Sequence, residues 1–192
     1  LRIPPIRVGQ EDRFDANVMD LILRNVREPE NSRGDFWAQL ASCRVGSRHI
    51  SRMMRRYGKE TTLAHFDEIL DASERRMRSM VRALPPSTIV HEDYLDNDGV
   101  QPDRRRIRVT VTVEDGDVVV DYSGTAPQSQ GPLNTTEVMT STFAFGAVKA
   151  ALDPKGHINS GCFRPIRVVV PKGTMLNCEE PAAAGGWTEL GL

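Results

Sequence analysis

The chain has 192 residues, with 25 Lys and Arg against 26 Asp and Glu, so its formal net charge is -1. A protein that binds nucleic acid or an anionic membrane surface normally carries a basic excess, so this balance argues against both kinds of partner. No apolar run approaches the roughly 20 residues that span a bilayer, which argues against a membrane protein. Hydrophobic residues make up 39% of the chain, which is typical of a globular domain.

The first and last residues, Leu1 and Leu192, suggest an interior stretch of a longer protein. The charge is also divided unequally along the chain. Residues 1–84 hold 16 Lys and Arg against 12 Asp and Glu, a net of +4, and residues 85–192 hold 9 against 14, a net of -5. We therefore expect a helical segment over 1–84 and a β-rich segment over 85–192, both belonging to one larger subunit.

Three helices are expected in the first segment, from apolar residues at helical spacing. They cover about 14–26, 35–57 and 60–84, with Pro29 ending the first and Gly58 the second. The two long helices, joined by a tight turn at Gly58, are expected to fold back as an antiparallel pair. On their apolar side, Cys43 is expected to be a core residue.

A stripe of arginines lies on the second of these helices. One interpretation is a contact for a phosphate or an acidic partner. The other, which we favour, is a solvated face that pairs across the hairpin with acidic residues of the third helix. The arginines are Arg44, Arg48, Arg52 and Arg55, and the acidic residues are Asp67, Glu68, Asp71 and Glu74.

The second segment shows the period of two that is typical of strands. Residues 107–113 and 118–122 flank an Asp-Gly turn and predict a hairpin, and 88–94 predicts a further strand. The acidic stretch 96–99 is interpreted as a turn, because it lacks the final glutamate of a calcium-binding loop. A long polar loop, a helix over 136–152, a loop over 157–165 and a strand over 166–170 follow.

Together these elements predict an α+β fold. It consists of an antiparallel helical hairpin, followed by a mainly antiparallel β-sheet with a packed helix and long loops. The loop over 123–136 is the longest of these connections, and loops of that length in a compact domain are often functional.

Cys162 is the candidate nucleophile of the chain, with His157 five residues upstream as its base. The alternative is a packed thiol, since spacing within a loop does not establish contact. The three cysteines form no CxxC pair, so a disulfide framework is not expected and a reducing cytoplasm is the expected location. The four histidines show no metal-binding spacing, so no metal site is expected within this chain.

Several polar and glycine residues in the loops are candidates for lining a substrate site. Asn134 and Asn159 can bond an amide or a carboxylate, although a turn or cap role is the usual one for asparagine. Arg164 can hold an anion, with a structural salt bridge as the favoured alternative. Gly185 and Gly186 allow close approach of the backbone to a ligand. No Walker or GxGxxG motif occurs, so nucleotide binding by this chain has no basis in the sequence.

Taken together, the chain resembles the hydantoinase B/oxoprolinase family. The matching segments run in order over essentially the whole sequence. They are 1–5 (LRIPP), 21–27 (LILRNVR), 34–39 (GDFWAQ), 73–78 (SERRMR), 92–96 (EDYLD), 121–128 (DYSGTAPQ), 131–134 (GPLN), 159–166 (NSGCFRPI) and 181–186 (PAAAGG). At 186–189 the sequence departs from the family pattern, which makes Glu189 a further candidate for the substrate site.

The resemblance implies a fragment of the B-type subunit of an ATP-dependent hydrolase that opens hydantoin or 5-oxoproline-like rings. It implies a hetero-oligomer in which a hydantoinase A-type partner binds ATP and activates a small-molecule substrate by phosphorylation. Any divalent metal ligands are expected outside this chain, and the fragment is not expected to be active by itself. The alternatives are the large subunit of an acetone or acetophenone carboxylase, and a non-catalytic scaffold or interface module.

Overall fold

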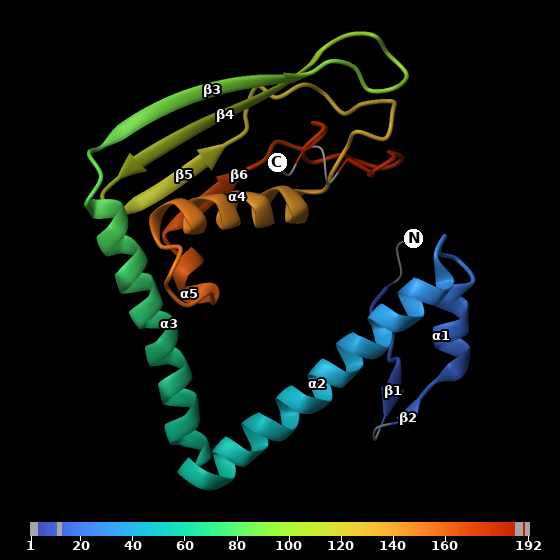
Figure 1. The fold of residues 1–192 in the computed structure, drawn as a ribbon, viewed down its shortest axis with the longest axis vertical. Coiled ribbons are helices and arrows are strands. Elements are labelled where there is room, and N and C mark those ends of the chain that lie inside the picture. The colour runs from blue at the N-terminus through green and yellow to red at the C-terminus, as the bar shows by residue number, and fades with distance from the viewer. Residues whose placement is uncertain (1–3, 11–12, 187–189, 191–192) are drawn as a thin grey trace. The chain divides into compact units, whose positions relative to one another are not determined.

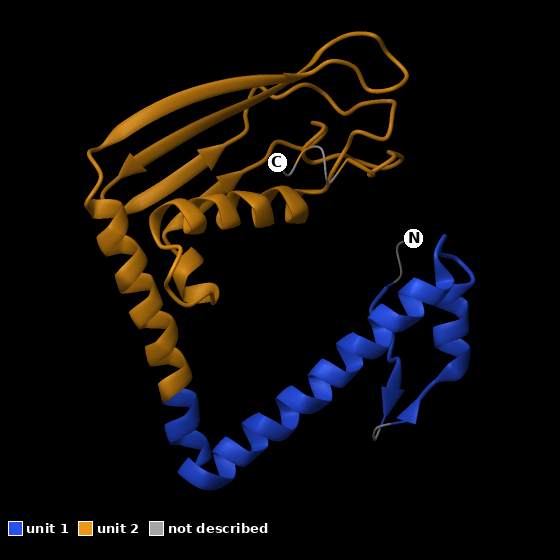
Figure 2. Cartoon of the chain, in the orientation of Figure 1, with its two compact units in different colours: residues 1–64 blue, residues 65–192 orange. Residues whose placement is uncertain are grey.

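The computed structural model describes residues 4–10, 13–186 and 190, and the chain forms two compact units, Leu1–Ala64 and His65–Leu192 (Figure 2). The division falls inside the helix α3 (Lys59–Arg82), whose end lies close to the change of composition expected near residue 84.

The first unit begins with a short antiparallel pair, β1 (Gly9–Gln10) and β2 (Arg13–Phe14), followed by the helix α1 (Ala16–Leu23) (Figure 1). Asp15 caps α1, because its carboxylate accepts hydrogen bonds from the backbone N–H groups of the first turn. The ring of Phe14 packs edge-on against Trp37 at 5.1 Å and lies under the guanidinium of Arg44.

The long helix α2 spans Pro29–Tyr57, so the expectation that Pro29 ends a helix was wrong. Proline fits the first helical position, because the N–H that it lacks has no partner there. No side chain of α2 is buried, and Cys43 is exposed rather than part of the core. Gly58 ends α2 with a positive φ of 85°. The antiparallel pairing of α2 with α3 stays a prediction, since α2 and most of α3 belong to different units.

The second unit is built on a four-stranded sheet in the order β3-β4-β5-β6 (Figure 1). The strands are β3 (Ser87–Leu95), β4 (Arg105–Glu114), β5 (Asp117–Asp121) and β6 (Ile166–Val169). The first two pairings are antiparallel, as expected, and β5 pairs with β6 in parallel, so the sheet is mixed. With its helices, this confirms the α+β class.

The hydrophobic core of the second unit lies between the sheet, α3 and the helix α4 (Glu137–Leu152). On β4 the inward side chains are Val109, Val111 and Val113, which match the predicted alternation. The fully buried members of the core come from five elements. They are Met77 and Val81 of α3, Val118 and Val120 of β5, Ala144 of α4, Cys162, and Ile166 of β6.

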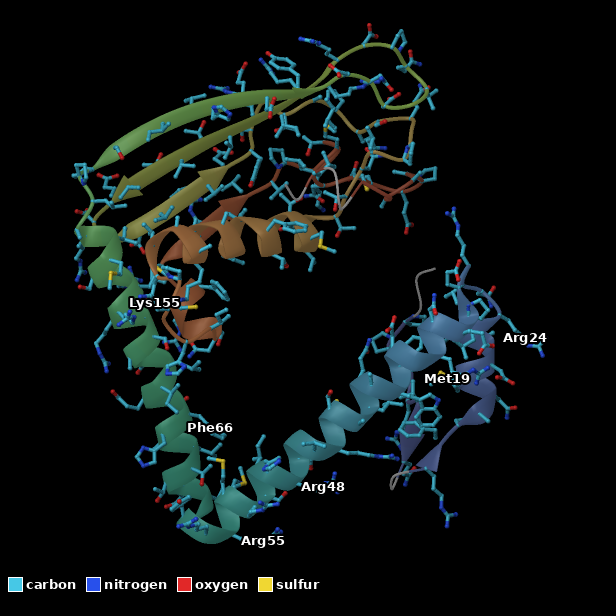
Figure 3. All side chains as sticks on the ribbon, viewed as in Figure 1. Met19, Arg24, Arg48, Arg55, Phe66 and Lys155 are labelled. Atoms are coloured by element: carbon cyan, nitrogen blue, oxygen red, sulfur yellow. The ribbon has the colours of Figure 1, made fainter. Side chains whose placement is uncertain are left out.

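Three acidic residues of α3 form ion pairs within the second unit. Glu68 pairs with Arg75 at 2.5 Å, and Glu74 pairs with Arg78 at 2.9 Å. Asp71 and Glu74 both pair with Arg164, which lies just before β6. These carboxylates therefore have partners within their own unit, and the pairing across the hairpin stays a prediction. Arg48 and Arg55 extend from α2 in Figure 3.

No helix in the described part of the chain is long and apolar enough to cross a membrane.

Candidate functional site

The predicted loop over 157–165 contains a short helix, α5 (Ser160–Phe163), that packs against α3. Asn159 caps it, with its side-chain oxygen 3.0 Å from the N–H of Gly161. The amide nitrogen of Asn159 donates a 2.8 Å hydrogen bond to the hydroxyl of Ser73 on α3. A Cβ at Gly161 would lie 2.0 Å from the carbonyl oxygen of Leu70, so only glycine allows this approach of α5 to α3.

Cys162 lies in the core with 1% of its surface exposed. Its thiol donates to the carbonyl oxygen of Asn159 at 3.0 Å, so the one weak donor of this side chain has a partner. His157, by contrast, is exposed and lines a neighbouring cavity. Although Cys162 and His157 are close in sequence, the hydrogen bond of the thiol goes to the backbone of Asn159 and not to His157.

Arg164 follows α5 and bonds to two carboxylates of α3. Its Nη1 lies 2.6 Å from Asp71 and 3.0 Å from Glu74. Hydrogen bonding from Arg164 and then from Arg78 lowers the pKa of Glu74. This is the structural salt bridge that we favoured for Arg164, and it fixes the end of α5 against α3.

A cavity of about 340 Å³, here called the α3–loop cavity, lies between α3 and the loop 153–157. Its walls are mixed, with apolar side chains and a hydroxyl on the helix and charged groups facing them. The lining residues are Ile69, Ala72, Ser73, Arg76, Asp153, Lys155, Gly156 and His157.

Three charged groups fix one wall of this cavity. Arg76 forms two hydrogen bonds with Asp153, at 2.9 and 2.7 Å. Lys149, buried at the end of α4, lies 3.2 Å from the same carboxylate and donates to the backbone carbonyls of Asp153 and Gly156. The hydrogen bonds from Arg76, followed by that from Lys149, lower the pKa of Asp153 to about 2.

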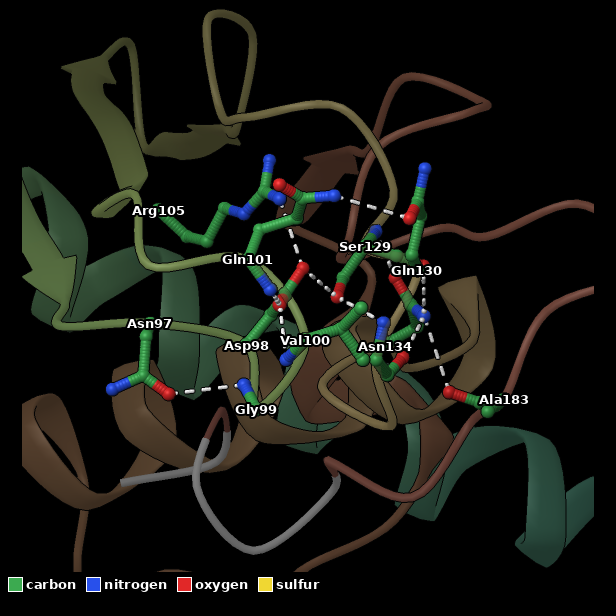
Figure 4. A network of polar contacts seen from close by, with 11 residues as sticks. Asn97, Asp98, Gly99, Val100, Gln101, Arg105, Ser129, Gln130, Asn134 and Ala183 are labelled. Atoms are coloured by element: carbon green, nitrogen blue, oxygen red, sulfur yellow. Dashed lines mark hydrogen bonds and ion pairs between the residues drawn. The ribbon is translucent and has the colours of Figure 1, made fainter.

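A second polar cluster organises the loop 123–136, and Figure 4 shows it in detail. Asp98 is fully buried at its centre. One carboxylate oxygen accepts from the backbone N–H of Val100 and Gln101, and the other accepts from the hydroxyl of Ser129 at 2.7 Å and from Arg105 at 2.8 Å. The hydrogen bond from Gln101 and then that from Ser129 hold the pKa of Asp98 well below its usual range.

Asn134 is also fully buried, and its whole amide group is used within the chain (Figure 4). Its oxygen accepts from the N–H of Ser129 at 2.7 Å. Its nitrogen donates to the carbonyls of Ser129, Gly131 and Ala183, at 3.0 to 3.1 Å. This one side chain therefore closes the polar loop and ties it to the glycine-rich segment 181–186.

The glycine-rich segment is held to the same loop through its backbone. Gly185 donates to the carbonyl of Pro132 at 2.9 Å and Gly186 donates to that of Asn134 at 3.1 Å. Gly185 is exposed and Gly186 is buried. Glu189, the remaining candidate, lies outside the described residues.

The predicted site residues thus fall into two groups. Asn134, Gly185 and Gly186 meet at the polar cluster, and His157, Asn159, Cys162 and Arg164 gather around α5. The sequence reasoning missed the buried charges. Lys149, the only charged residue in the apolar stretch 143–152, was a signal that could have found one of them.

Metal binding has no support from the described side chains, among which no three His, Cys, Asp or Glu residues come together as a ligand set. The carboxylates of Asp98 and Asp153 are occupied by arginine, lysine and backbone donors. The expectation that metal ligands lie outside this chain stays a prediction.

Comparison with known proteins identifies relatives along the whole chain. The family model for hydantoinase B/oxoprolinase matches residues 1–191. The putative D-/L-hydantoinase B subunit of Pseudomonas sp. (strain NS671) is 32% identical over 193 residues, which cover 95% of this chain and 33% of that protein.

Two solved structures share the fold. The ATP-dependent caprolactamase from Pseudomonas jessenii has a TM-score of 0.81 and 26% identity, covering all of this chain and 34% of its own. The nucleotide-free acetone carboxylase has the same TM-score, with 17% identity, covering 95% of this chain and 26% of its own. That second likeness shows the fold alone. The chain spans about a third of the length of its hydantoinase relative.

Proposed function

The chain belongs to the hydantoinase B/oxoprolinase family, and we propose that it forms part of the B-type subunit of an ATP-dependent hydrolase of cyclic amides. The substrate of that enzyme would be a small ring of the hydantoin or 5-oxoproline type. The observation that carries the proposal is the family match over residues 1–191. The 32% identity with a putative hydantoinase of the B type supports the hydrolase branch.

The proposal includes an ATP-binding partner. One relative is named as a single subunit of a hydantoinase, and a solved relative is described as ATP-dependent. Since this chain carries no nucleotide-binding motif, ATP would enter through a hydantoinase A-type subunit of a hetero-oligomer. That partner would phosphorylate the ring, and the B-type subunit would support its opening. The pattern of cysteines favours the cytoplasm as the location.

Within this chain, we assign different roles to the candidate residues at the polar cluster. The amide of Asn134 is used up by four hydrogen bonds, so its proposed role is to position the glycine-rich segment. Gly185 is exposed on that segment, where a Cβ would meet nothing closer than 3.4 Å. It is therefore the residue proposed to border the substrate.

Around α5, the proposed roles follow from the same contacts. Asn159 and Arg164 fix α5 on α3, and the side chain of Cys162, within α5, is buried in the core. A nucleophilic Cys162 would need His157 or another base to reach its sulfur, because the thiol now donates to a backbone carbonyl.

The test is ATP-dependent ring opening by the full-length protein mixed with its A-type partner, on hydantoin, 5-oxoproline and caprolactam. Ring opening of at least one substrate is expected. Bicarbonate-dependent consumption of a ketone, with no turnover of any cyclic amide, would instead assign the protein to the carboxylase branch.

The same assay tests whether Gly185 borders the substrate. Gly185→Ala adds one methyl group at an exposed position, and we expect it to lower kcat/KM about tenfold, the factor that corresponds to 1.4 kcal/mol. Gly46→Ala is the control, since a Cβ there meets nothing within 4 Å. Equal activity of the two variants would remove Gly185 from the site and favour the scaffold alternative.

A further inference from the structure

We propose that the α3–loop cavity binds a small organic anion, through Arg76, Lys155 and His157. These residues line a cavity of about 340 Å³. Lys155 is labelled in Figure 3.

The charge of the cavity carries the first step. Among the described residues, its only acidic lining residue is Asp153, which is 4% exposed. That carboxylate is paired with both Arg76 and Lys149, so two positive charges already face one negative charge. Lys155 adds a further positive charge, and His157 adds one when protonated. The walls therefore carry a positive excess that an anion would neutralise.

The second step is the fixed orientation of Arg76. Its Nε and one terminal nitrogen are bound to Asp153, so the planar guanidinium is held in place on the cavity wall. Its other terminal nitrogen bonds to no side chain or backbone group in the described part of the chain. A guanidinium held in this way binds an oxyanion without losing further side-chain freedom.

The loop that carries Lys155 and His157 is fixed too. Gly156, between them, accepts a hydrogen bond from buried Lys149 at 3.0 Å. A Cβ on Gly156 would lie 1.9 Å from the carboxylate of Asp153, so the loop packs directly on that side chain. Both basic residues flank this anchored point, and both are exposed toward the cavity.

The size and lining of the cavity indicate the size of its ligand. An inorganic anion occupies little of 340 Å³, since a water molecule takes about 30 Å³ in the liquid. The helix side of the cavity offers Ile69, which is 53% exposed, and Ala72. Ser73 is already bonded to Ile69 and Asn159. The walls thus fit a carboxylate or phosphate group on a short apolar skeleton.

The experiment is a titration of the full chain followed by its backbone amide resonances. Butanoate and butyl phosphate serve as probes with one apolar skeleton and two different oxyanions, and inorganic phosphate tests the skeleton. Saturable shifts at 153–157 and at Arg76 are expected with at least one organic probe, and weaker binding of inorganic phosphate. The better organic probe identifies the oxyanion.

The matched variants are Lys155→Gln with His157→Gln, and Lys172→Gln with His91→Gln, all at exposed positions. The first pair is expected to weaken binding tenfold or more, and the second to change it less than twofold. Absence of saturable shifts with both organic probes at about 20 mM, where a millimolar site would be filled, would overturn the proposal. Equal weakening by the two pairs would also overturn it, because the interaction would then reflect net charge only.

Discussion

Arg76 and Asp153 lie 77 residues apart in the sequence and are joined by two hydrogen bonds, of 2.9 and 2.7 Å. The pair connects α3 to the end of α4, and Lys149 bonds to the same carboxylate from within α4. Asp153 and Lys149 are both about 95% buried, so the three residues form a largely buried ion-pair network inside the second unit.

We expect Asp153→Asn to lower the free energy of unfolding by about 2 to 4 kcal/mol, because it leaves Lys149 buried without a counter-charge. Urea unfolding followed by circular dichroism measures the change. The control is Asp96→Asn, since Asp96 is 84% exposed and faces Arg104 at 3.5 Å, and we expect it to stay within about 0.5 kcal/mol of the wild type. A similar effect of both substitutions would contradict this account.

Two buried carboxylates, those of Asp153 and Asp98, predict how the free energy of unfolding depends on pH. The pKa of Asp153 is lowered to about 2, chiefly by Arg76, and that of Asp98 is lowered chiefly by the N–H of Gln101. A depressed pKa in the folded state stabilises the protein above the pKa of the unfolded state, about 3.9. We therefore expect this contribution to decline as the pH falls from about 4 through 2.

Urea unfolding at several pH values between 6 and 2 tests this dependence. The advantage of the wild type over Asp153→Asn should be constant down to about pH 4 and shrink below it. A constant difference between the two proteins across the whole range would show that the depressed pKa is absent.

Two glycines in helices give opposite predictions for the same substitution. We expect Gly161→Ala to destabilise the protein by about 1 to 3 kcal/mol, because its Cβ would meet the backbone of Leu70 at 2.0 Å. We expect Gly146→Ala in α4 to stabilise it by about 0.5 to 1 kcal/mol, since open space surrounds that position and alanine favours helix. Thermal unfolding of both variants measures the two signs, and stabilisation by Gly161→Ala would refute the packing of α5 on α3.

Asn134 offers a prediction about the polar cluster. Asn134→Ala leaves the N–H of Ser129 and the carbonyls of Gly131 and Ala183 without their partner, so we expect a loss of about 3 kcal/mol or more. Amide hydrogen exchange should also accelerate at Gly185 and Gly186. Asn97→Ala is the comparison, because Asn97 is exposed and its oxygen accepts one local hydrogen bond from Gly99. Equal losses would mean that burial of Asn134 contributes little.

The three cysteines should differ in reactivity in the folded chain. Cys43 is exposed, Cys178 is partly buried and Cys162 is 1% exposed. Iodoacetamide labelling followed by peptide mass spectrometry should therefore modify Cys43 first and Cys162 last. Rapid labelling of Cys162 in the native protein would show that its thiol is accessible and would strengthen its candidacy as a nucleophile.

The local patterns of the sequence predicted most elements of the fold. Alternation placed β4 and β5, and the Asp-Gly turn between them was correct because few residues other than glycine adopt φ near +86°. The parallel pairing of β5 with β6 was not predictable in this way, since no local signal states which neighbour a strand chooses. Pro29 was misread because a proline fits both after a helix and at its first position.

The candidate site was predicted only in part for the same reason. Asn159 fits its cap position by local rules, whereas the partners of Asn134 include Ala183, which is 49 residues away. Asp98 lies in a sequence typical of an exposed turn, and that turn indeed forms. Its burial depends on Ser129 and Arg105, which reach it only once the loop and the strand are assembled.

The parallel pairing of β5 with β6 has a consequence for the order of folding. The hairpin of β4 and β5 closes across a single tight turn, so it forms from residues adjacent in sequence. The last strand joins the sheet only after the whole segment 122–165, including α4, has been brought round. Since contacts between distant residues form more slowly, β6 should be the last strand acquired and the first to open.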